Sequence, residues 1–233
     1  FAKNKVVFMD ETPQPEGYEY LYLTGHPMGS SLYYQCIGIN RTEEDLKNYP
    51  QMAGSGLGDY IYKDIDENGK IDAKDMLRSD LNTIPQIVFG LTANFQYKNF
   101  DLSILFQGQA LARLHYTPLQ APLEGNITKE MATQSWNLDR PDAKYGRINS
   151  TNNRKESTMW LRNASFLRLK NVELGYNFSG KALKTVGVKG LRLYIGGYNL
   201  FTISGLKEVD PETNNTAAYP LMRVFNTGVK VTF

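Results

Sequence analysis

The sequence is poor in cysteine and histidine, with one Cys and two His among 233 residues. Cys36 therefore has no partner for a disulfide within the chain. His26 and His115 are too few for a zinc cluster or a histidine-based catalytic relay, and no serine or cysteine nucleophile motif stands near either of them. Since no catalytic set is visible, we expect a protein that is not an enzyme.

A long apolar run and a block of basic residues are also missing. No window approaches the roughly 18 consecutive apolar residues that a membrane-spanning helix needs. The 26 basic and 24 acidic side chains give a formal charge of +2 without a basic stripe, so nucleic acid is not an expected partner. A membrane β-barrel stays possible, because its alternating strands average to a mean hydropathy as ordinary as the −0.43 of this chain.

The sequence is rich in tyrosine and phenylalanine, with 15 and 11 respectively, which favours strands. Apolar residues occupy every second position from Ile87 to Tyr97, and the alternation resumes from Phe100 to Phe106. Only two residues separate these runs, which predicts a tight hairpin. Its register pairs apolar side chains on one face, namely Tyr97 with Phe100, Phe95 with Leu102, Ala93 with Ile104 and Leu91 with Phe106.

The other face of this hairpin is polar, with Gln96 opposite Asp101 and Asn94 opposite Ser103. Such pairs suit a water-filled lumen better than a sandwich core. The same alternation predicts three more strands, within residues 171–178, 191–196 and 225–233. Residues 5–9 and 32–39 show a weaker alternation and are further candidate strands.

Short and long connections alternate between the predicted strands. The hairpin loop has two residues, whereas long segments separate strand 100–108 from strand 164–178 and strand 190–200 from strand 221–233. Outer-membrane barrels combine short periplasmic turns with long external loops, and this parity places residues before Ile87 on the external side. Aromatic residues near the short turn, such as Tyr97 and Tyr176, match the rings that line a membrane interface.

Residues 64–75 have the ligand spacing of an EF-hand calcium loop. The six ligand positions hold Asp64, Asp66, Asn68, Lys70 through its backbone carbonyl, Asp72 and Asp75. Gly69 stands at the sharp turn, and Ca²⁺ is the expected guest because it accepts several oxygens in flexible geometry. Two features differ from an EF-hand: the last ligand is Asp instead of Glu, and no helix-forming segment precedes the loop. The alternative is a polar Asn-Gly turn with solvated carboxylates.

Three aromatic residues, Trp136, Tyr145 and Trp160, lie in or beside the long connection between Gln109 and Trp160. Their rings are candidates for substrate binding, by stacking on sugar rings or peptide side chains. The commoner explanation of such aromatics is that they pack the connection onto itself.

A series of short motifs runs through the chain. They are residues 25–30 (GHPMGS), 58–59 (GD), 64–72 (DIDENGKID), 85–89 (PQIVF), 97–102 (YKNFDL), 167–172 (LRLKNV), 174–176 (LGY), 199–201 (NLF), 210–212 (DPE) and 219–220 (YP). In this order the chain resembles the carboxy-terminal part of the SusC/RagA family of TonB-dependent outer-membrane transporters from Bacteroidetes. The resemblance covers nearly the whole sequence.

The resemblance implies an all-β fold, in which residues 1–233 form the last strands of a large antiparallel transmembrane barrel of about 22 strands with long extracellular loops. Residues 64–75 would be a calcium-type loop within this portion, and the plug domain and earlier strands would precede Phe1. The family resides in the bacterial outer membrane and imports oligosaccharides or peptides. It implies as partners a SusD-like surface lipoprotein, and TonB through the preceding part of the protein. Phe233 resembles the recognition residue for the barrel assembly machinery.

Five to seven strands are too few to close a barrel, which takes about eight. We therefore expect open edge strands that pair with the remaining barrel strands of the same protein, and an apolar face that meets outer-membrane lipid. The alternative is a secreted, calcium-stabilised β-domain that binds glycans. In that domain the apolar side chains would be buried between two packed sheets.

Overall fold

The computed structural model describes residues 1–116, 127–178, 187–207, 209–213 and 219–233. They form two compact units. The sheet unit comprises residues 1–2, 83–114 and 163–233, and the loop unit comprises residues 3–82 and 115–162. Among the described residues, no helix is both long and apolar enough to span a membrane.

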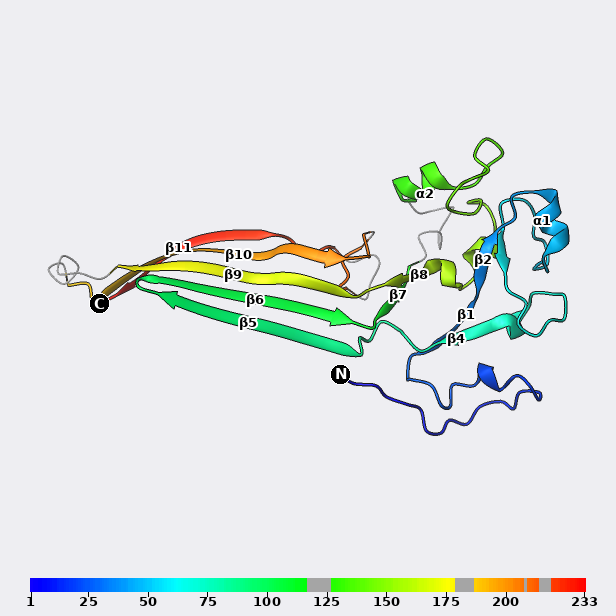
Figure 1. Cartoon of the computed structure of the whole chain (residues 1–233), viewed down its shortest axis with the longest axis horizontal. Coiled ribbons are helices and arrows are strands. Elements are labelled where there is room, and N and C mark those ends of the chain that lie inside the picture. Colours follow the sequence, from blue (N-terminus) through cyan, green and yellow to red (C-terminus); the bar gives the residue numbers. More distant parts are fainter. Residues whose placement is uncertain (117–126, 179–186, 208, 214–218) are drawn as a thin grey trace. The chain divides into compact units, whose positions relative to one another are not determined.

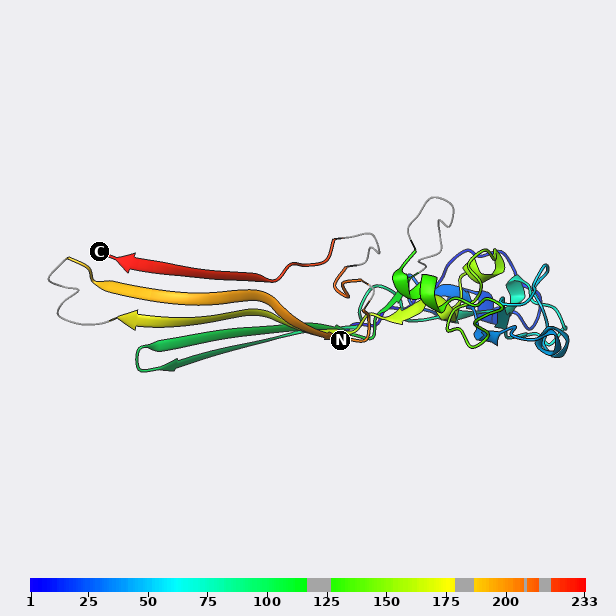
Figure 2. The ribbon, with the colours of Figure 1, turned by 90° about the horizontal axis from the view of Figure 1, so that it is seen from above.

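The sheet unit contains one antiparallel sheet (Figures 1 and 2). Its strands are β5 (Ile87–Tyr97), β6 (Phe100–Ala110), β9 (Phe166–Phe178), β10 (Gly190–Ser204) and β11 (Val224–Thr232). Their order across the sheet is β11-β10-β9-β6-β5. The five strands that the alternation predicts are thus confirmed.

The hairpin of β5 and β6 has the predicted register. Tyr97 pairs with Phe100, and the pairing continues without a shift to Ile87 and Ala110. Lys98, the first residue of the loop, has a φ of 52°, in the left-handed region that a two-residue hairpin loop requires. The short loop therefore fixes which side chains share a face.

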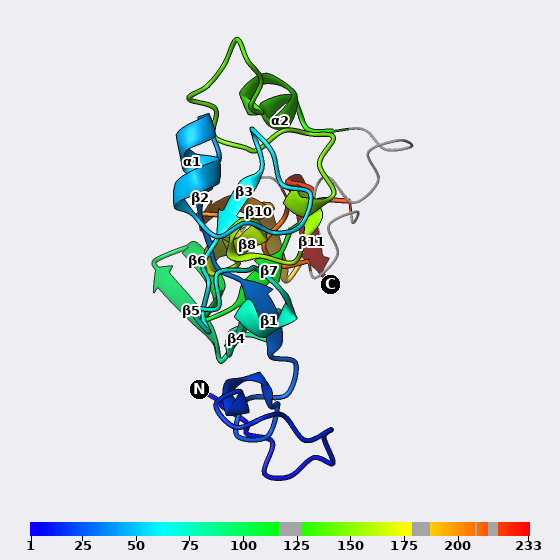
Figure 3. The ribbon, with the colours of Figure 1, turned by 90° about the vertical axis from the view of Figure 1, so that its right-hand side faces the viewer.

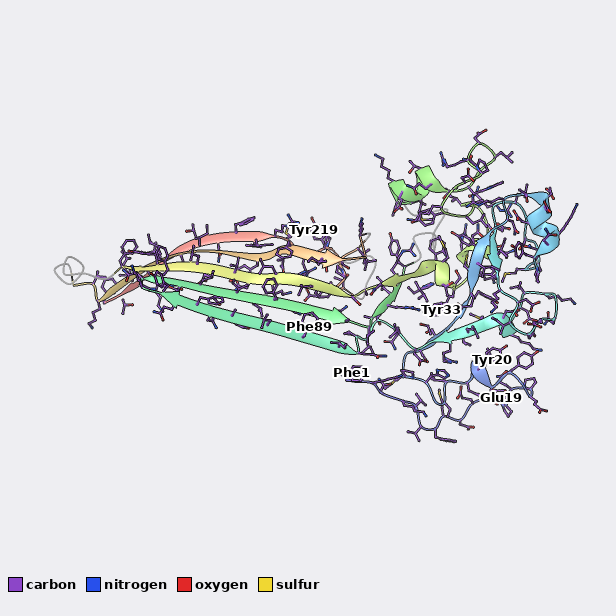
Figure 4. The ribbon with its side chains drawn as sticks, in the orientation of Figure 1. Phe1, Glu19, Tyr20, Tyr33, Phe89 and Tyr219 are labelled. Carbon is purple, nitrogen blue, oxygen red and sulfur yellow. The ribbon has the colours of Figure 1, made fainter. Side chains whose placement is uncertain are left out.

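One face of the sheet is apolar across all five strands. A single row runs from Phe95 through Leu102, Leu174 and Ile195 to Thr227. These side chains lie at the surface: Phe95 is 59% exposed and Ile195 is 61% exposed. Figure 4 labels Phe89 on β5, which is also exposed. Among the described residues of the sheet unit, no second sheet packs on this face, in contrast to the packing expected of a secreted β-domain.

Aromatic side chains gather beside the hairpin loop. The rings of Phe100 and Tyr176 are 4.8 Å apart, and those of Tyr176 and Phe178 are 4.7 Å apart, both in edge-on arrangements. Lys98 Nζ lies 5.3 Å from the centre of the Tyr97 ring. This cluster has the composition and position expected of a ring of interfacial aromatics.

The sheet does not close on itself. Among the described residues β5 and β11 each pair with one strand, so both edges expose backbone N–H and C=O groups, as predicted. Phe233 directly follows β11 and is exposed.

The loop unit consists of short elements around an aromatic core (Figure 3). The elements are η1 (Glu19–Leu21), β1 (Ser31–Tyr34), β2 (Cys36–Ile39), α1 (Glu43–Asn48), β3 (Tyr60–Tyr62), η2 (Ala73–Asp75), β4 (Met76–Ser79), α2 (Lys129–Gln134), η3 (Asn152–Arg154) and η4 (Thr158–Trp160). β1 pairs with β4, and β2 pairs with β3. Two further strands, β7 (Arg113–His115) and β8 (Leu161–Asn163), pair where the chain passes between the units.

Two strand predictions need correction. Residues 32–39 form two strands, because the chain changes partner at Gln35, from β4 to β3. Residues 5–9 form no strand: Val6 exchanges backbone hydrogen bonds with Gly25 and His26, but no ladder extends from this contact. Weak alternation alone did not distinguish these segments from regular strands.

Candidate functional site

The acidic loop 64–75 wraps around its own carboxylates. Oxygens of Asp64, Asp66 and Asp75 lie within 4.8 Å of one another. The loop is closed by the backbone N–H of Gly69, which donates to Asp64 Oδ2 at 2.7 Å, and Gly69 has a φ of 79°. A residue with a side chain would be strained at this turn, which explains the glycine.

Asp75 is the buried member of this cluster. Its side chain is fully buried and accepts hydrogen bonds from the backbone N–H groups of Ile65, at 2.7 Å, and Asp72, at 2.8 Å. Asp72 itself caps η2 by accepting from Lys74 N–H, and it is not part of the three-carboxylate cluster. The structure thus brings together three of the predicted ligands through their carboxylates.

Asn68 lies beside this cluster. Its Oδ1 accepts from Lys70 N–H at 2.8 Å, and its amide nitrogen donates to Asp66 Oδ2 at 2.8 Å. Tyr18 O–H also donates to Asp66 Oδ2 at 2.8 Å, and this bond holds the pKa of Asp66 below its ordinary value. The same bond raises the pKa of Tyr18.

One oxygen in the cluster has no hydrogen-bond partner among the described residues. Asp64 Oδ1 is buried and receives no hydrogen bond from them, although two other carboxylates lie close by. Three carboxylates at this separation repel each other unless a proton or a cation intervenes. Hard oxygen ligands around a wrapped loop are the donors that Ca²⁺ prefers, so these residues fit the predicted ion.

The three predicted substrate-binding aromatics do not form one surface. Trp160 is fully buried, Tyr145 is 2% exposed, and their rings stack 6.3 Å apart at the centre of the core. Trp160 Nε1 donates to the carbonyl of Asn153 at 3.0 Å. The burial of this pair favours the packing alternative. Trp136 is half-buried and lines a cavity, so substrate binding at Trp136 stays a prediction.

The polar face of the sheet holds charged groups that the sequence did not identify as a site. Arg192 donates to Asp101 from Nε at 3.0 Å and to Glu173 from Nη2 at 2.7 Å, and Asn177 donates to Asp101 at 2.7 Å. The predicted hairpin register placed Asp101 on this face, but its partners come from β9 and β10. Their strand order was not predictable from the alternation.

A second cluster on the same unit centres on Arg168, which is 2% exposed. Its guanidinium donates to Asp210 at 2.7 Å and to Glu212 at 2.6 Å, and Lys170 also contacts Glu212 at 2.9 Å. The acidic partners belong to the DPE motif at 210–212, so this motif holds the connection after β10 against β9. This motif and the motif at 167–172, which contains Arg168 and Lys170, were both visible in the sequence, but their pairing was not.

No protein-family model matches the chain. Several curated proteins are similar to it in sequence. The chain is 28% identical to the TonB-dependent receptor P3 of Formosa agariphila over 90% of its own length and 22% of that protein. It is also 28% identical to the TonB-dependent receptor SusC of Bacteroides thetaiotaomicron, over 75% of the chain and 19% of that protein.

Solved structures share its fold. The RagAB peptide transporter matches 90% of the chain and 23% of the transporter chain with a TM-score of 0.66 and 20% identity. The RagAB peptide importer in its closed-closed state matches 95% of the chain, also with a TM-score of 0.66. The chain spans no more than about a quarter of the length of these proteins. The all-β, antiparallel fold class predicted from the sequence is confirmed. Over most of its length, the chain is similar in sequence to TonB-dependent receptors, SusC among them.

Proposed function

We propose that this chain forms part of the barrel wall and external loops of a TonB-dependent outer-membrane importer. The importer takes up oligosaccharides or peptides together with a SusD-like surface lipoprotein. The observation that carries the proposal is the five-stranded sheet with one exposed apolar face and one charged face. The relatives are receptors and transporters, in keeping with a protein that is not an enzyme.

The two faces have different roles in this proposal. The apolar face meets outer-membrane hydrocarbon, and the face with Arg192 and Asp101 lines a hydrated lumen. The edges at β5 and β11 pair with further strands of the same protein, and Phe233 serves as the signal for barrel assembly. Residues 1–233 thus form the carboxy-terminal portion of the barrel, and TonB acts on a plug formed by another part of the protein.

The loop unit forms external loops that face the lipoprotein. Within it the loop 64–75 binds Ca²⁺ through Asp64, Asp66 and Asp75, with Asn68, Lys70 and Asp72 as the remaining predicted ligands. The buried, unpartnered Asp64 Oδ1 supports this assignment. Bound Ca²⁺ relieves the repulsion between the carboxylates and stiffens the loop.

Import is tested in cells that produce or lack the protein. Uptake of fluorescent oligosaccharide and peptide pools should require the protein, and a protonophore, which removes the energy that TonB transmits, should abolish it. Affinity purification of the intact protein from the membrane should recover a surface lipoprotein. Uptake that is unchanged without the protein would contradict the proposal.

Calcium binding is tested with Tb³⁺, whose emission is sensitised by nearby aromatic rings. Tyr18 contacts Asp66 directly, so the intact protein should show sensitised Tb³⁺ emission. Added Ca²⁺ should displace the Tb³⁺ and lower this emission. Asp64→Asn should weaken the site, and Asp139→Asn, at an exposed carboxylate outside the loop, should leave it unchanged. Equal emission from both variants would contradict the assignment of Asp64.

A further inference from the structure

The loop unit contains a cavity of about 610 Å³ beside Trp136. Its lining includes Trp136, the exposed side chains of Asn137, Leu138 and Asp139 that follow it, and Asn149. The volume lies in the range of small-molecule binding sites. Of the three aromatics predicted to bind substrate, only Trp136 lines this cavity.

Trp136 is held in place by its ring packing and by a backbone hydrogen bond. A side-chain Cβ at Gly58 would lie 2.3 Å from Cε3 of the indole, so the ring packs directly on the backbone at Gly58. The backbone N–H of Trp136 donates to the carbonyl of Tyr145 at 2.8 Å. Arg147, which also lines the cavity, is fixed by Asp59. The site is therefore formed before any ligand arrives, which lowers the entropic cost of binding.

The polar groups around the ring are mostly uncharged. Asn137 and Asn149 each carry an amide that can donate and accept, and Asp139 supplies one carboxylate. The guanidinium of Arg147 is paired through Nε and Nη2 with the buried Asp59, which compensates its charge. Leu138 is 82% exposed and extends the apolar surface of the rim.

This combination matches the two kinds of surface on a sugar ring. A pyranose has an apolar C–H face that packs on an aromatic ring, and hydroxyl groups at its edge that bond to amides and carboxylates. A peptide, in contrast, brings a terminal carboxylate or acidic side chains, and the cation in this lining, Arg147, is already paired with Asp59. An amphipathic ring bordered by a few polar groups is typical of specific ligand sites.

We propose that the cavity beside Trp136 binds a sugar unit of a neutral oligosaccharide, stacked on the indole and hydrogen-bonded by Asn137, Asn149 and Asp139. This inference rests on the proposed import function and narrows its substrate class to glycans at this position. A peptide is the competing occupant.

The test is calorimetric titration of the intact, detergent-extracted protein with four neutral hexasaccharides, namely maltohexaose, cellohexaose, laminarihexaose and xylohexaose, and with an uncharged and an acidic hexapeptide. At least one hexasaccharide should bind. Trp136→Ala should weaken binding by about thirtyfold or more, as expected when an aromatic anchor is truncated. Trp136→Phe should retain most of the affinity because a ring remains.

Two variants separate binding from folding. Asn149→Ala removes an exposed amide without touching the core, and should weaken binding by about fivefold, the loss of one hydrogen bond. Tyr49→Ala, in a different cavity of the loop unit, should bind like the native protein. The inference is overturned if no hexasaccharide binds at millimolar concentration, if Asn149→Ala binds like Tyr49→Ala while Trp136→Ala is unfolded, or if a peptide binds instead.

Uptake measurements distinguish this inference from the proposed function. If energy-dependent uptake persists while the cavity binds no sugar, the sugar assignment fails and import stands. If sugar binds in a Trp136-dependent way but no uptake depends on the protein, the import function fails and the binding site stands.

Discussion

Arg147 donates hydrogen bonds to both carboxylate oxygens of Asp59, from Nε to Oδ1 at 2.6 Å and from Nη2 to Oδ2 at 2.8 Å. Asp59 is fully buried, and the ion pair raises the pKa of Arg147. The backbone N–H of Arg147 also donates to the carbonyl of Gly58 at 2.7 Å. The ion pair joins two segments that lie 88 residues apart and holds Arg147, which lines the Trp136 cavity.

Removing the guanidinium should destabilise the loop unit. Arg147→Ala leaves a buried, uncompensated carboxylate, and breaking such a pair costs about 3 kcal/mol, the lower end of the usual range because Arg147 is partly exposed. The free energy of unfolding can be measured by pulse proteolysis of the intact protein in urea. Lys144→Ala is the control: its pair with Glu130 is largely exposed, so the loss should stay below about 1 kcal/mol. Equal losses would contradict this ranking.

A pair of glycine substitutions tests the packing of Trp136. Gly58 and Gly69 both have positive φ, at 82° and 79°, so alanine at either position brings backbone strain of about 1 kcal/mol. At Gly58 the added Cβ also clashes with the indole, whereas nothing lies within 4 Å at Gly69. In thermal unfolding, Gly58→Ala should therefore lower the melting temperature clearly more than Gly69→Ala. Similar shifts would show that Trp136 is free to move away.

The pKa of Cys36 predicts slow reaction with alkylating agents. Burial raises the pKa of this thiol to about 11. At pH 8 only about one molecule in a thousand then carries the reactive thiolate, against about a quarter for a free thiol of pKa 8.5. Iodoacetamide labelling, followed by mass spectrometry, should accelerate steadily up to pH 10. A rate that levels off near pH 9 would contradict the raised pKa.

The same burial of Cys36 predicts a pH effect on stability. The pKa of this thiol is about 11 in the folded protein, against roughly 8.5 in the unfolded chain. The thiol form therefore contributes stability that is fully present below the unfolded pKa. This stability is lost as the pH rises toward the folded pKa. Cys36→Ala should therefore show a smaller loss of melting temperature between pH 8 and pH 10.5 than the native protein. An identical loss in both proteins would contradict the linkage.

Charged substitutions on the two faces of β5 should behave differently. Leu91→Lys places a charge on the exposed apolar face and should cost about 2–4 kcal/mol near the membrane midplane. Asn94→Lys, on the polar face, should be tolerated. The amount of heat-modifiable, folded protein in isolated outer membranes measures both effects. Equal amounts of the two variants would contradict the assignment of the faces.

Local pattern predicted the regular part of this fold. The two residues between Tyr97 and Phe100 fixed the hairpin register, and this register placed Phe95 and Leu102 on one face. The spacing of the acidic loop likewise placed Asp64, Asp66 and Asp75 in one cluster. In each case the interacting residues are close in sequence, so local backbone geometry and hydrogen bonding determine their arrangement.

Contacts between distant segments were not predictable in this way. Asp59 with Arg147, and Arg168 with Asp210, depend on the path of long connections whose conformation no periodic pattern encodes. The burial of Trp160 and Tyr145 was not predictable for the same reason. The sequence does not indicate whether an aromatic residue in a long connection packs in the core or contacts a ligand. Parts of these connections, at 117–126, 208 and 214–218, lie outside the described residues.

The position of the apolar face is tested most directly by spin-label accessibility along β5. Single cysteines at positions 91–96, in the intact protein with its other cysteines replaced, are labelled in lipid vesicles and probed with oxygen and with a water-soluble nickel complex. Oxygen should relax the labels at 91, 93 and 95, and nickel those at 92, 94 and 96, because hydrocarbon meets one face and water the other. Labels at 91, 93 and 95 that are shielded from both reagents would instead place these side chains in a protein core and contradict a membrane-spanning sheet.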